Sequence, residues 1–249
     1  MDNTDKFSGK AEIYDKSRPN YATHLIEYLA KKFSTNITIA DIGSGTGKFA
    51  KEFLKRGYKV FCVEPNKDMR ILAEKILSDY NTFVSVNGTD INTTLADNSI
   101  DLITVAQAFH WFDVEGFKSE CKRILKQNGI INIAYNHRVM GSDFVNENAE
   151  ICKKLCTNFK GFNNKFSVEA MAKIDYLYDN KYETLHFNNN LVYSKKLFIE
   201  RMLSASYAPT EKDLSYNEYV TALENLFDKY SENNVLILPN ETIAYIGTL

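Results

Sequence analysis

The chain has 249 residues, of which 44% are hydrophobic, 13% aromatic and 25% charged, a composition typical of a globular protein. Thirty basic and 32 acidic residues leave a net charge of −2, and the arginines are scattered, whereas a nucleic-acid groove requires clustered cations. No apolar run approaches the ~18 residues of a membrane span, and residues 1–6 lack the features of a signal peptide. We therefore expect neither a nucleic-acid partner nor a membrane association.

The cysteines and histidines show no metal-binding pattern. The four cysteines form no C-x-x-C pair and have no histidine at zinc-finger spacing. The four histidines share no ligand spacing with carboxylates. We expect no metal site, and we expect reduced thiols in a cytoplasmic protein.

The first half of the chain alternates helical and strand patterns. The expected helices cover 22–33, a segment from Phe49 that stops at Gly57, a segment with apolar positions between 69 and 77, and 114–126. The expected strands are 37–42, 58–63, 82–86, 101–105 and 130–135. This alternation predicts a parallel sheet with crossover helices, in a doubly wound α/β fold.

Beyond Asn136 the rhythm changes. Helical patterns cover 142–159, 168–177, 195–204 and 217–230, and extended patterns cover 182–192, 235–238 and 242–246. We expect the late extended segments to complete a mostly parallel seven-stranded sheet, and the helices to form a cap over the strand ends, where such sheets bind ligands. The expected organisation is a core over 1–135 with an N-terminal lid at 1–21. Residues 136–249 supply cap segments and the last strands of the same domain.

A glycine-rich loop lies between the first expected strand and the following helix. Gly43, Gly45 and Gly47 alternate with other residues, and glycine permits left-handed backbone torsions and a close approach to a ligand. A phosphate loop of NTPases is excluded because Ile42 stands where its first glycine belongs. A dinucleotide fingerprint is weakened because Lys48 replaces its third glycine.

The pattern Asp41-x-Gly43-x-Gly45-x-Gly47 resembles the first motif of the class I S-adenosylmethionine-dependent methyltransferases. Glu64 ends the next expected strand, where the resemblance implies an acid that accepts both ribose hydroxyls. Asp90 follows the third strand, where this family contacts the adenine edge, and the resemblance also implies that Asp41 orients the loop and approaches the methionine ammonium.

The resemblance extends over roughly residues 7–135 and includes two further stretches, 97–101 and 123–126. It implies a Rossmann-like methyltransferase fold without a metal, which binds S-adenosylmethionine and releases S-adenosylhomocysteine. The implied cofactor-binding residues are Asp41, Gly43, Ser44, Gly45, Gly47, Glu64, Pro65, Asp90, Ile91, Ala106 and Gln107.

Residues 106–113, with the sequence A-Q-A-F-H-W-F-D, are similar to a segment of a small-molecule subgroup that includes trans-aconitate methyltransferases. The start of the chain is similar to that subgroup's N-terminal lid. This narrower resemblance and the expected strand ends give the candidate catalytic residues His110, Tyr14 and Arg18 and the candidate substrate residues Trp111, His137 and Arg138. Core packing is the alternative for Trp111, a structural role is the alternative for His110, and Asp113 is placed to cap the next helix.

The resulting hypothesis is an enzyme that transfers a methyl group to a small-molecule acceptor by direct displacement. A protein that binds S-adenosylmethionine without methylating anything is one alternative. A nicotinamide oxidoreductase is the other, because an NAD enzyme also places an acid at the position of Glu64.

Overall fold

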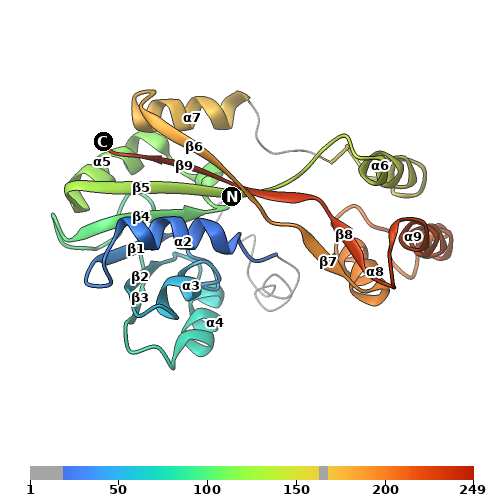
Figure 1. Ribbon diagram of the computed structural model, residues 1–249, viewed down its shortest axis with the longest axis horizontal. Helices are drawn as coiled ribbons and strands as arrows, with labels where there is room; N and C mark the ends of the chain where they lie inside the picture. The colour runs from blue at the N-terminus through green and yellow to red at the C-terminus, as the bar shows by residue number, and fades with distance from the viewer. Residues whose placement is uncertain (1–18, 163–167) are drawn as a thin grey trace. The chain divides into compact units, whose positions relative to one another are not determined.

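A seven-stranded sheet dominates the computed structural model, which describes residues 19–162 and 168–249 (Figure 1). The strands lie in the order β3-β2-β1-β4-β5-β9-β6, and β1 to β5 pair in parallel. Their bounds are β1 Thr38–Ile42, β2 Lys59–Val63, β3 Phe83–Val86, β4 Ile100–Ala106, β5 Leu125–Arg138, β6 Tyr182–Asn188 and β9 Asn240–Gly247. The predicted doubly wound, mostly parallel sheet is therefore confirmed.

Helices and a shared apolar core hold this sheet. The helices of the first half are α2 Thr23–Lys32, α3 Ala50–Leu54, α4 Lys67–Leu77 and α5 Val114–Ile124, and the short 3-10 helix η2 spans Phe109–Trp111. Leu25 and Leu29 of α2 and Phe53 of α3 are buried with Ile39 of β1 in one cluster. Strands β1 and β4 are buried along almost their whole length. Their sequences are therefore mostly continuous apolar runs, without the alternation of apolar and polar residues seen in half-exposed strands.

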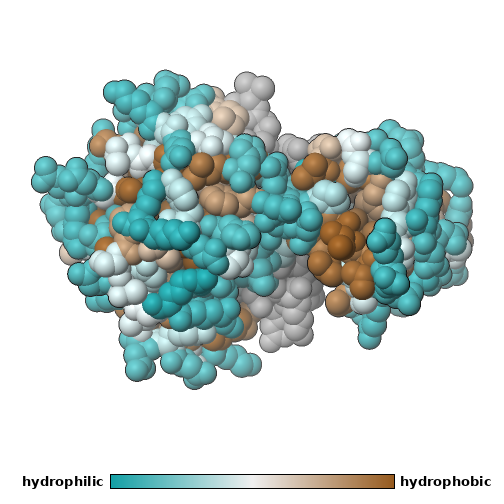
Figure 2. Space-filling model, viewed as in Figure 1, coloured by the Kyte–Doolittle hydropathy of each residue, from teal (hydrophilic) through white to brown (hydrophobic). Residues whose placement is uncertain are grey.

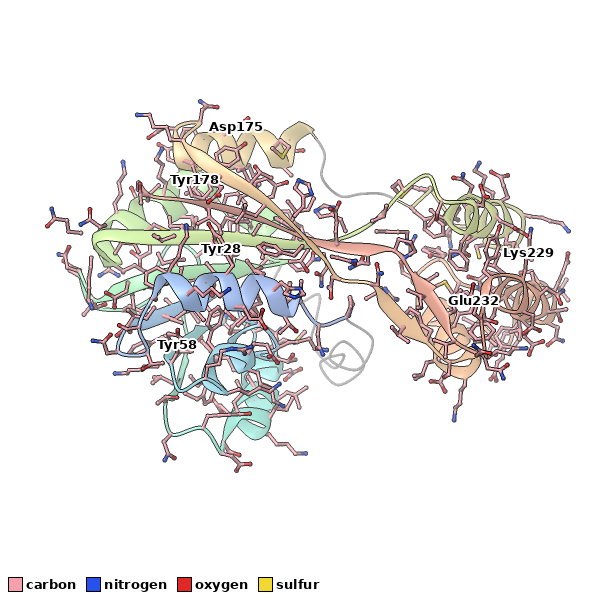
Figure 3. The ribbon with its side chains drawn as sticks, viewed as in Figure 1. Tyr28, Tyr58, Asp175, Tyr178, Lys229 and Glu232 are labelled. Atoms are coloured by element: carbon pink, nitrogen blue, oxygen red, sulfur yellow. The ribbon has the colours of Figure 1, made fainter. Side chains whose placement is uncertain are left out.

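Tyr178, labelled in Figure 3, joins a later helix to the sheet. It is the last residue of α7 (Val168–Tyr178), and its hydroxyl lies 3.1 Å from the carbonyl oxygen of Ile131 and 2.9 Å from that of Tyr245. Lys118 of α5 donates to the Tyr176 carbonyl oxygen at 2.7 Å. These contacts fix α7 against α5, β5 and β9.

The described chain divides into two compact units. The first comprises 19–136, 168–187 and 242–249, and the second comprises 137–162 and 188–241. The second unit holds α6 Asp143–Leu155, β7 Leu191–Tyr193, α8 Lys195–Leu203, α9 Tyr216–Tyr230 and β8 Leu236–Leu238. Its core includes Phe144, Phe198, Tyr219 and Phe227, so each unit has an apolar core of its own.

The late extended segments do not all join the large sheet, contrary to the sequence prediction. The expected strand 182–192 is two strands, because the asparagines at 188–190 interrupt it and β7 turns away to pair antiparallel with β8. Only β6 and β9 complete the seven-stranded sheet. Val192 and Ile237 face each other across the small sheet with 63% and 57% of their surfaces exposed, and Figure 2 shows an apolar patch there.

One helix boundary also differs from the prediction. The helix expected over 114–126 ends at Ile124, and β5 begins at Leu125 instead of residue 130. Leu125, a position inside the expected helix, pairs instead with Ile100 of β4, and Asn128 adopts a positive φ of 63°. In the part of the chain that the structure describes, no helix is long and apolar enough to span a membrane.

Candidate cofactor site

The glycine loop begins where β1 ends, and β2 anchors it. Gly43, Gly45 and Gly47 have φ values of +69°, +57° and +79°, in the region where residues with a Cβ are strained. The N–H of Gly43 donates to the carbonyl oxygen of Val63 at 2.8 Å. A Cβ on Gly43 would lie 2.7 Å from the Cβ of Ala108, whereas a Cβ on Gly45 would meet no heavy atom within 4 Å. The loop is therefore closely packed at Gly43 and open at Gly45.

Glu64 faces this loop from the end of β2. Its Oε2 accepts a hydrogen bond from the Gly45 N–H at 2.9 Å, and its Oε1 accepts one from the Asn66 N–H at 2.8 Å. Burial raises the pKa of Glu64, against the effect of these two bonds and of the nearby Arg70 charge. Arg70 in turn donates to the carbonyl oxygens of Glu64 and Pro65. The carboxylate is thus held beside Gly45 with lone pairs that a hydroxyl could share.

Asp41 lies at the centre of a polar row that crosses the sheet. It is paired in register with Thr104 of β4, which is paired with Asn132 of β5. The Thr104 hydroxyl donates to Asp41 Oδ1 at 2.7 Å, while Oδ2 is buried and has no hydrogen-bond partner among the described residues. Burial raises the pKa of Asp41 to about 7, although the Thr104 bond opposes the shift. Asp41 therefore retains one acceptor for a bound group or a water molecule.

Asn132 is part of the same row and is fully buried, and neither polar atom of its side chain has a hydrogen-bond partner within the described part of the chain. The sequence analysis missed both Asn132 and Thr104. A signal was available, since each is a polar residue inside an otherwise apolar strand, but the register that aligns them with Asp41 follows from the tertiary structure.

The loop after β3 meets the segment that precedes α5. Asp90 Oδ2 accepts a hydrogen bond from the Asp113 N–H at 2.9 Å, and burial raises the pKa of Asp90. Ile91 is 51% exposed. Asp113 occupies the N-cap position of α5 as predicted, yet its side chain makes no capping hydrogen bond. The Asp90 carboxylate is therefore held at the start of α5, and the side chain of the neighbouring Ile91 is accessible to solvent.

The end of β4 and the segment after it contain four of the remaining candidates. Ala106 ends the strand, and Gln107 adopts a positive φ of 59° and donates from its side chain to the Asn136 carbonyl oxygen at 3.1 Å. His110 and Trp111 lie in η2 with ring centroids 4.6 Å apart, and Trp111 is 38% exposed. The strand therefore ends in a sharp turn that carries two adjacent aromatic rings.

The other candidates are placed differently. Ser44 lies within the glycine loop. Burial raises the pKa of Cys62, and the Ser44 hydroxyl acts in the opposite direction on that pKa. His137 and Arg138 belong to the second unit. Tyr14 and Arg18 lie outside the described residues. Within 19–162 and 168–249, no group of three or more His, Cys, Asp or Glu side chains could hold a metal ion.

Residues 40–133, which include the glycine loop, Glu64 and η2, match the family model of the methyltransferase domain. This part of the chain is therefore similar to a methyltransferase domain. An uncharacterized methyltransferase of Mycobacterium bovis is 31% identical over 145 residues, which cover 58% of this chain and 58% of that protein. The similarity thus spans little more than half the length of such a relative.

Two solved structures have a similar fold. A provisionally named type II methyltransferase from Anaeromyxobacter dehalogenans superposes with a TM-score of 0.65 at 16% identity, covering 92% of this chain and 95% of the other; at that identity it shows the fold alone. A provisionally named S-adenosylmethionine-dependent methyltransferase from Methanococcus maripaludis is 26% identical, with a TM-score of 0.51, over 75% of this chain and 86% of its own.

Proposed function

We propose that this chain transfers a methyl group from S-adenosylmethionine to a small-molecule acceptor by direct displacement, in the cytoplasm. The observation that carries the proposal is the position of the Glu64 carboxylate against the N–H of Gly45, the loop glycine with open space beside it. The carboxylate can accept hydrogen bonds from a pair of hydroxyls on a ligand. The open, left-handed glycine lets the protein main chain approach that ligand closely.

The residues fit the cofactor at three further points. The Oδ2 atom of Asp41, which has no hydrogen-bond partner among the described residues, provides an acceptor for the methionine ammonium. Asp90 and the exposed Ile91 provide a polar and an apolar contact for an adenine ring. The remaining proposed contacts are Gly43, Ser44, Gly47, Pro65, Ala106 and Gln107.

When bound, S-adenosylmethionine would supply a methyl group whose carbon the acceptor attacks opposite the sulfur, so that the bond from acceptor to carbon forms as the carbon–sulfur bond breaks and S-adenosylhomocysteine leaves. The protein's task is to hold the reacting atoms about 3–3.5 Å apart. Because positive charge is lost from sulfur during the transfer, the ring of Trp111 can line the site without opposing the reaction. His110, beside that ring, serves as a base only for an acceptor that must lose a proton.

The two alternatives differ from the proposal in what they bind. A nicotinamide oxidoreductase would bind NAD at the same loop, and the match of residues 40–133 to a methyltransferase domain favours S-adenosylmethionine instead. A non-catalytic binder would take the cofactor and produce no S-adenosylhomocysteine with any acceptor.

Calorimetric titration with S-adenosylhomocysteine, with NAD in parallel, tests the cofactor. We expect binding near micromolar affinity, or about −8 kcal/mol, by the wild-type protein. Glu64→Ala should abolish this binding. Glu74→Ala should leave it unchanged, because among the described residues the Glu74 side chain accepts a hydrogen bond from the Ser85 hydroxyl alone. Binding of NAD alone, or of neither compound, would refute the proposed cofactor.

Formation of S-adenosylhomocysteine across pools of small acids, phenols and amines tests the reaction. A protein that binds the cofactor yet yields no product in any pool would support the non-catalytic alternative.

A further inference from the structure

The second unit contains two arginines that lack an acidic partner. Arg138 is the last residue of β5 and Arg201 lies on α8. Neither guanidinium forms an ion pair with a carboxylate of the described residues, whereas Arg123 of the first unit pairs with both Asp97 and Glu120. The Arg201 guanidinium donates a hydrogen bond from Nη1 to the Ser204 hydroxyl at 3.3 Å.

The environment of Arg138 is aromatic rather than acidic. Its Cζ lies 4.0 Å from the centroid of the Phe162 ring, a distance at which a cation interacts with the ring face. Phe159 packs edge-on against both Phe162 and Tyr207, with centroids 4.9 and 5.0 Å apart. All of these side chains are only partly buried, so the cluster remains accessible from solvent.

The charges around this cluster favour an anion. Burial lowers the pKa of Arg138, and the positive charge of Arg201 lowers it further. Removing a cation from water without a counter-ion costs free energy, and two like charges close together add to that cost. An anion beside the Arg138 guanidinium would offset both costs, and arginine binds a carboxylate through two parallel hydrogen bonds.

We propose that Arg138 and Arg201, with the rings of Phe159, Phe162 and Tyr207, form a binding site for a ligand that joins a carboxylate to a planar apolar body. The guanidinium groups hold the carboxylate, and the aromatic edges contact the body of the ligand. The proposed site lies wholly within the second unit, so the proposal stands apart from the function proposed above. Binding of the ligand to the second unit can be measured without cofactor.

The test compares three planar acids with their neutral amides by ligand-observed NMR titration of the full chain. The pairs are benzoate with benzamide, cinnamate with cinnamamide, and indole-3-acetate with indole-3-acetamide. We expect at least one acid to bind the wild-type protein ten or more times tighter than its amide. Equal binding of acid and amide in all three pairs overturns the proposal.

Variants assign the preference to the two arginines. Arg138→Gln and Arg201→Gln should each remove most of the tenfold preference. Lys196→Gln should preserve it, because this control removes one positive charge from the same helix at a side chain that is 84% exposed. Should Arg138→Gln fail to fold, Arg201→Gln decides. An equal loss of preference in the Lys196 variant would show a general charge effect and overturn the site.

Titration of the same proteins with S-adenosylhomocysteine separates the two proposals. The wild type and all three variants should bind it equally, since the proposed cofactor contacts lie in the first unit. Acid preference without cofactor binding would refute the methyl transfer and keep the carboxylate site, and the reverse result would refute the site alone.

Discussion

A pair of glycine substitutions distinguishes a cofactor contact at Gly45 from ordinary backbone strain. Gly45 and Gly57 have φ values of +57° and +83°, and a Cβ on either would meet no heavy atom within 4 Å. Alanine in the left-handed region costs about 1–2 kcal/mol, partly offset by the lower entropy of the unfolded chain. Gly45→Ala and Gly57→Ala should therefore each lose about 1 kcal/mol of unfolding free energy, or about 2–4 °C in Tm.

Cofactor affinity should separate the two variants. The open space beside Gly45 is where the proposed ligand approaches the main chain, so a methyl group there should weaken S-adenosylhomocysteine binding by about 1–3 kcal/mol, the usual cost of overpacking. This corresponds to a loss of affinity of about 5- to 150-fold in a calorimetric titration. Gly57 follows α3 and is not among the proposed contacts, so Gly57→Ala should bind as the wild type does. Equal affinities in the two variants would refute the placement of the cofactor at Gly45.

Three further predictions concern stability and pH. Gly47→Ala should lose about 2–4 kcal/mol of unfolding free energy in urea denaturation, because backbone strain adds to a clash between the new Cβ and the buried side chain of Leu77; a loss under 1 kcal/mol would contradict it. Because the pKa of Asp41 is raised to about 7 by burial and its carboxylate form attracts an ammonium, S-adenosylhomocysteine affinity should rise about tenfold from pH 6 to pH 8. Asp41→Asn should remove that slope, and a slope that persists would exclude Asp41 as its source. Burial favours a higher pKa for Glu120, but the hydrogen bonds that its carboxylate accepts, those from Arg123 first among them, together outweigh this effect and lower the pKa to about 2. The free energy of unfolding should therefore fall as the pH drops from 4.5 toward 2. Discounted for solvent screening, the loss is about 1–2 kcal/mol, and denaturation of Glu120→Gln at pH 5 and pH 3 should show a correspondingly smaller loss.

Local patterns predicted most of the large sheet because they reflect local physics. Buried parallel strands are continuous apolar runs, and the glycines mark the turn after β1, so β1 to β4 and α2 to α5 fall within a few residues of the expected ranges. The predictions failed where partners distant in sequence decide the structure. The extension of β5 back to Leu125 depends on Ile100, and the pairing of β7 with β8 joins segments about 45 residues apart, which no local period encodes.

The same division applies to the candidate site. The loop glycines and Glu64 could be predicted because each follows a strand directly, and the carboxyl ends of neighbouring parallel strands meet at one edge of the sheet. The hydrogen bond between Glu64 and the Gly45 N–H is consistent with that expectation. The partners of Asp41 could not be predicted in this way. The register between β1, β4 and β5 decides which polar residues of these strands align with Asp41, and it aligns Thr104 and Asn132.

The sequence by itself determined the sheet type, the position of the glycine loop and the acid that follows it, because these depend on residues close together in the chain. The tertiary structure alone decided that the Arg138 guanidinium lies against the Phe162 ring and that the charge of Arg201, 63 positions later in the chain, adds to the effect of burial in lowering the pKa of Arg138. The physical reason is that side chains from a strand end and a separate helix meet only after both have packed, and no periodicity or motif in the chain records that packing.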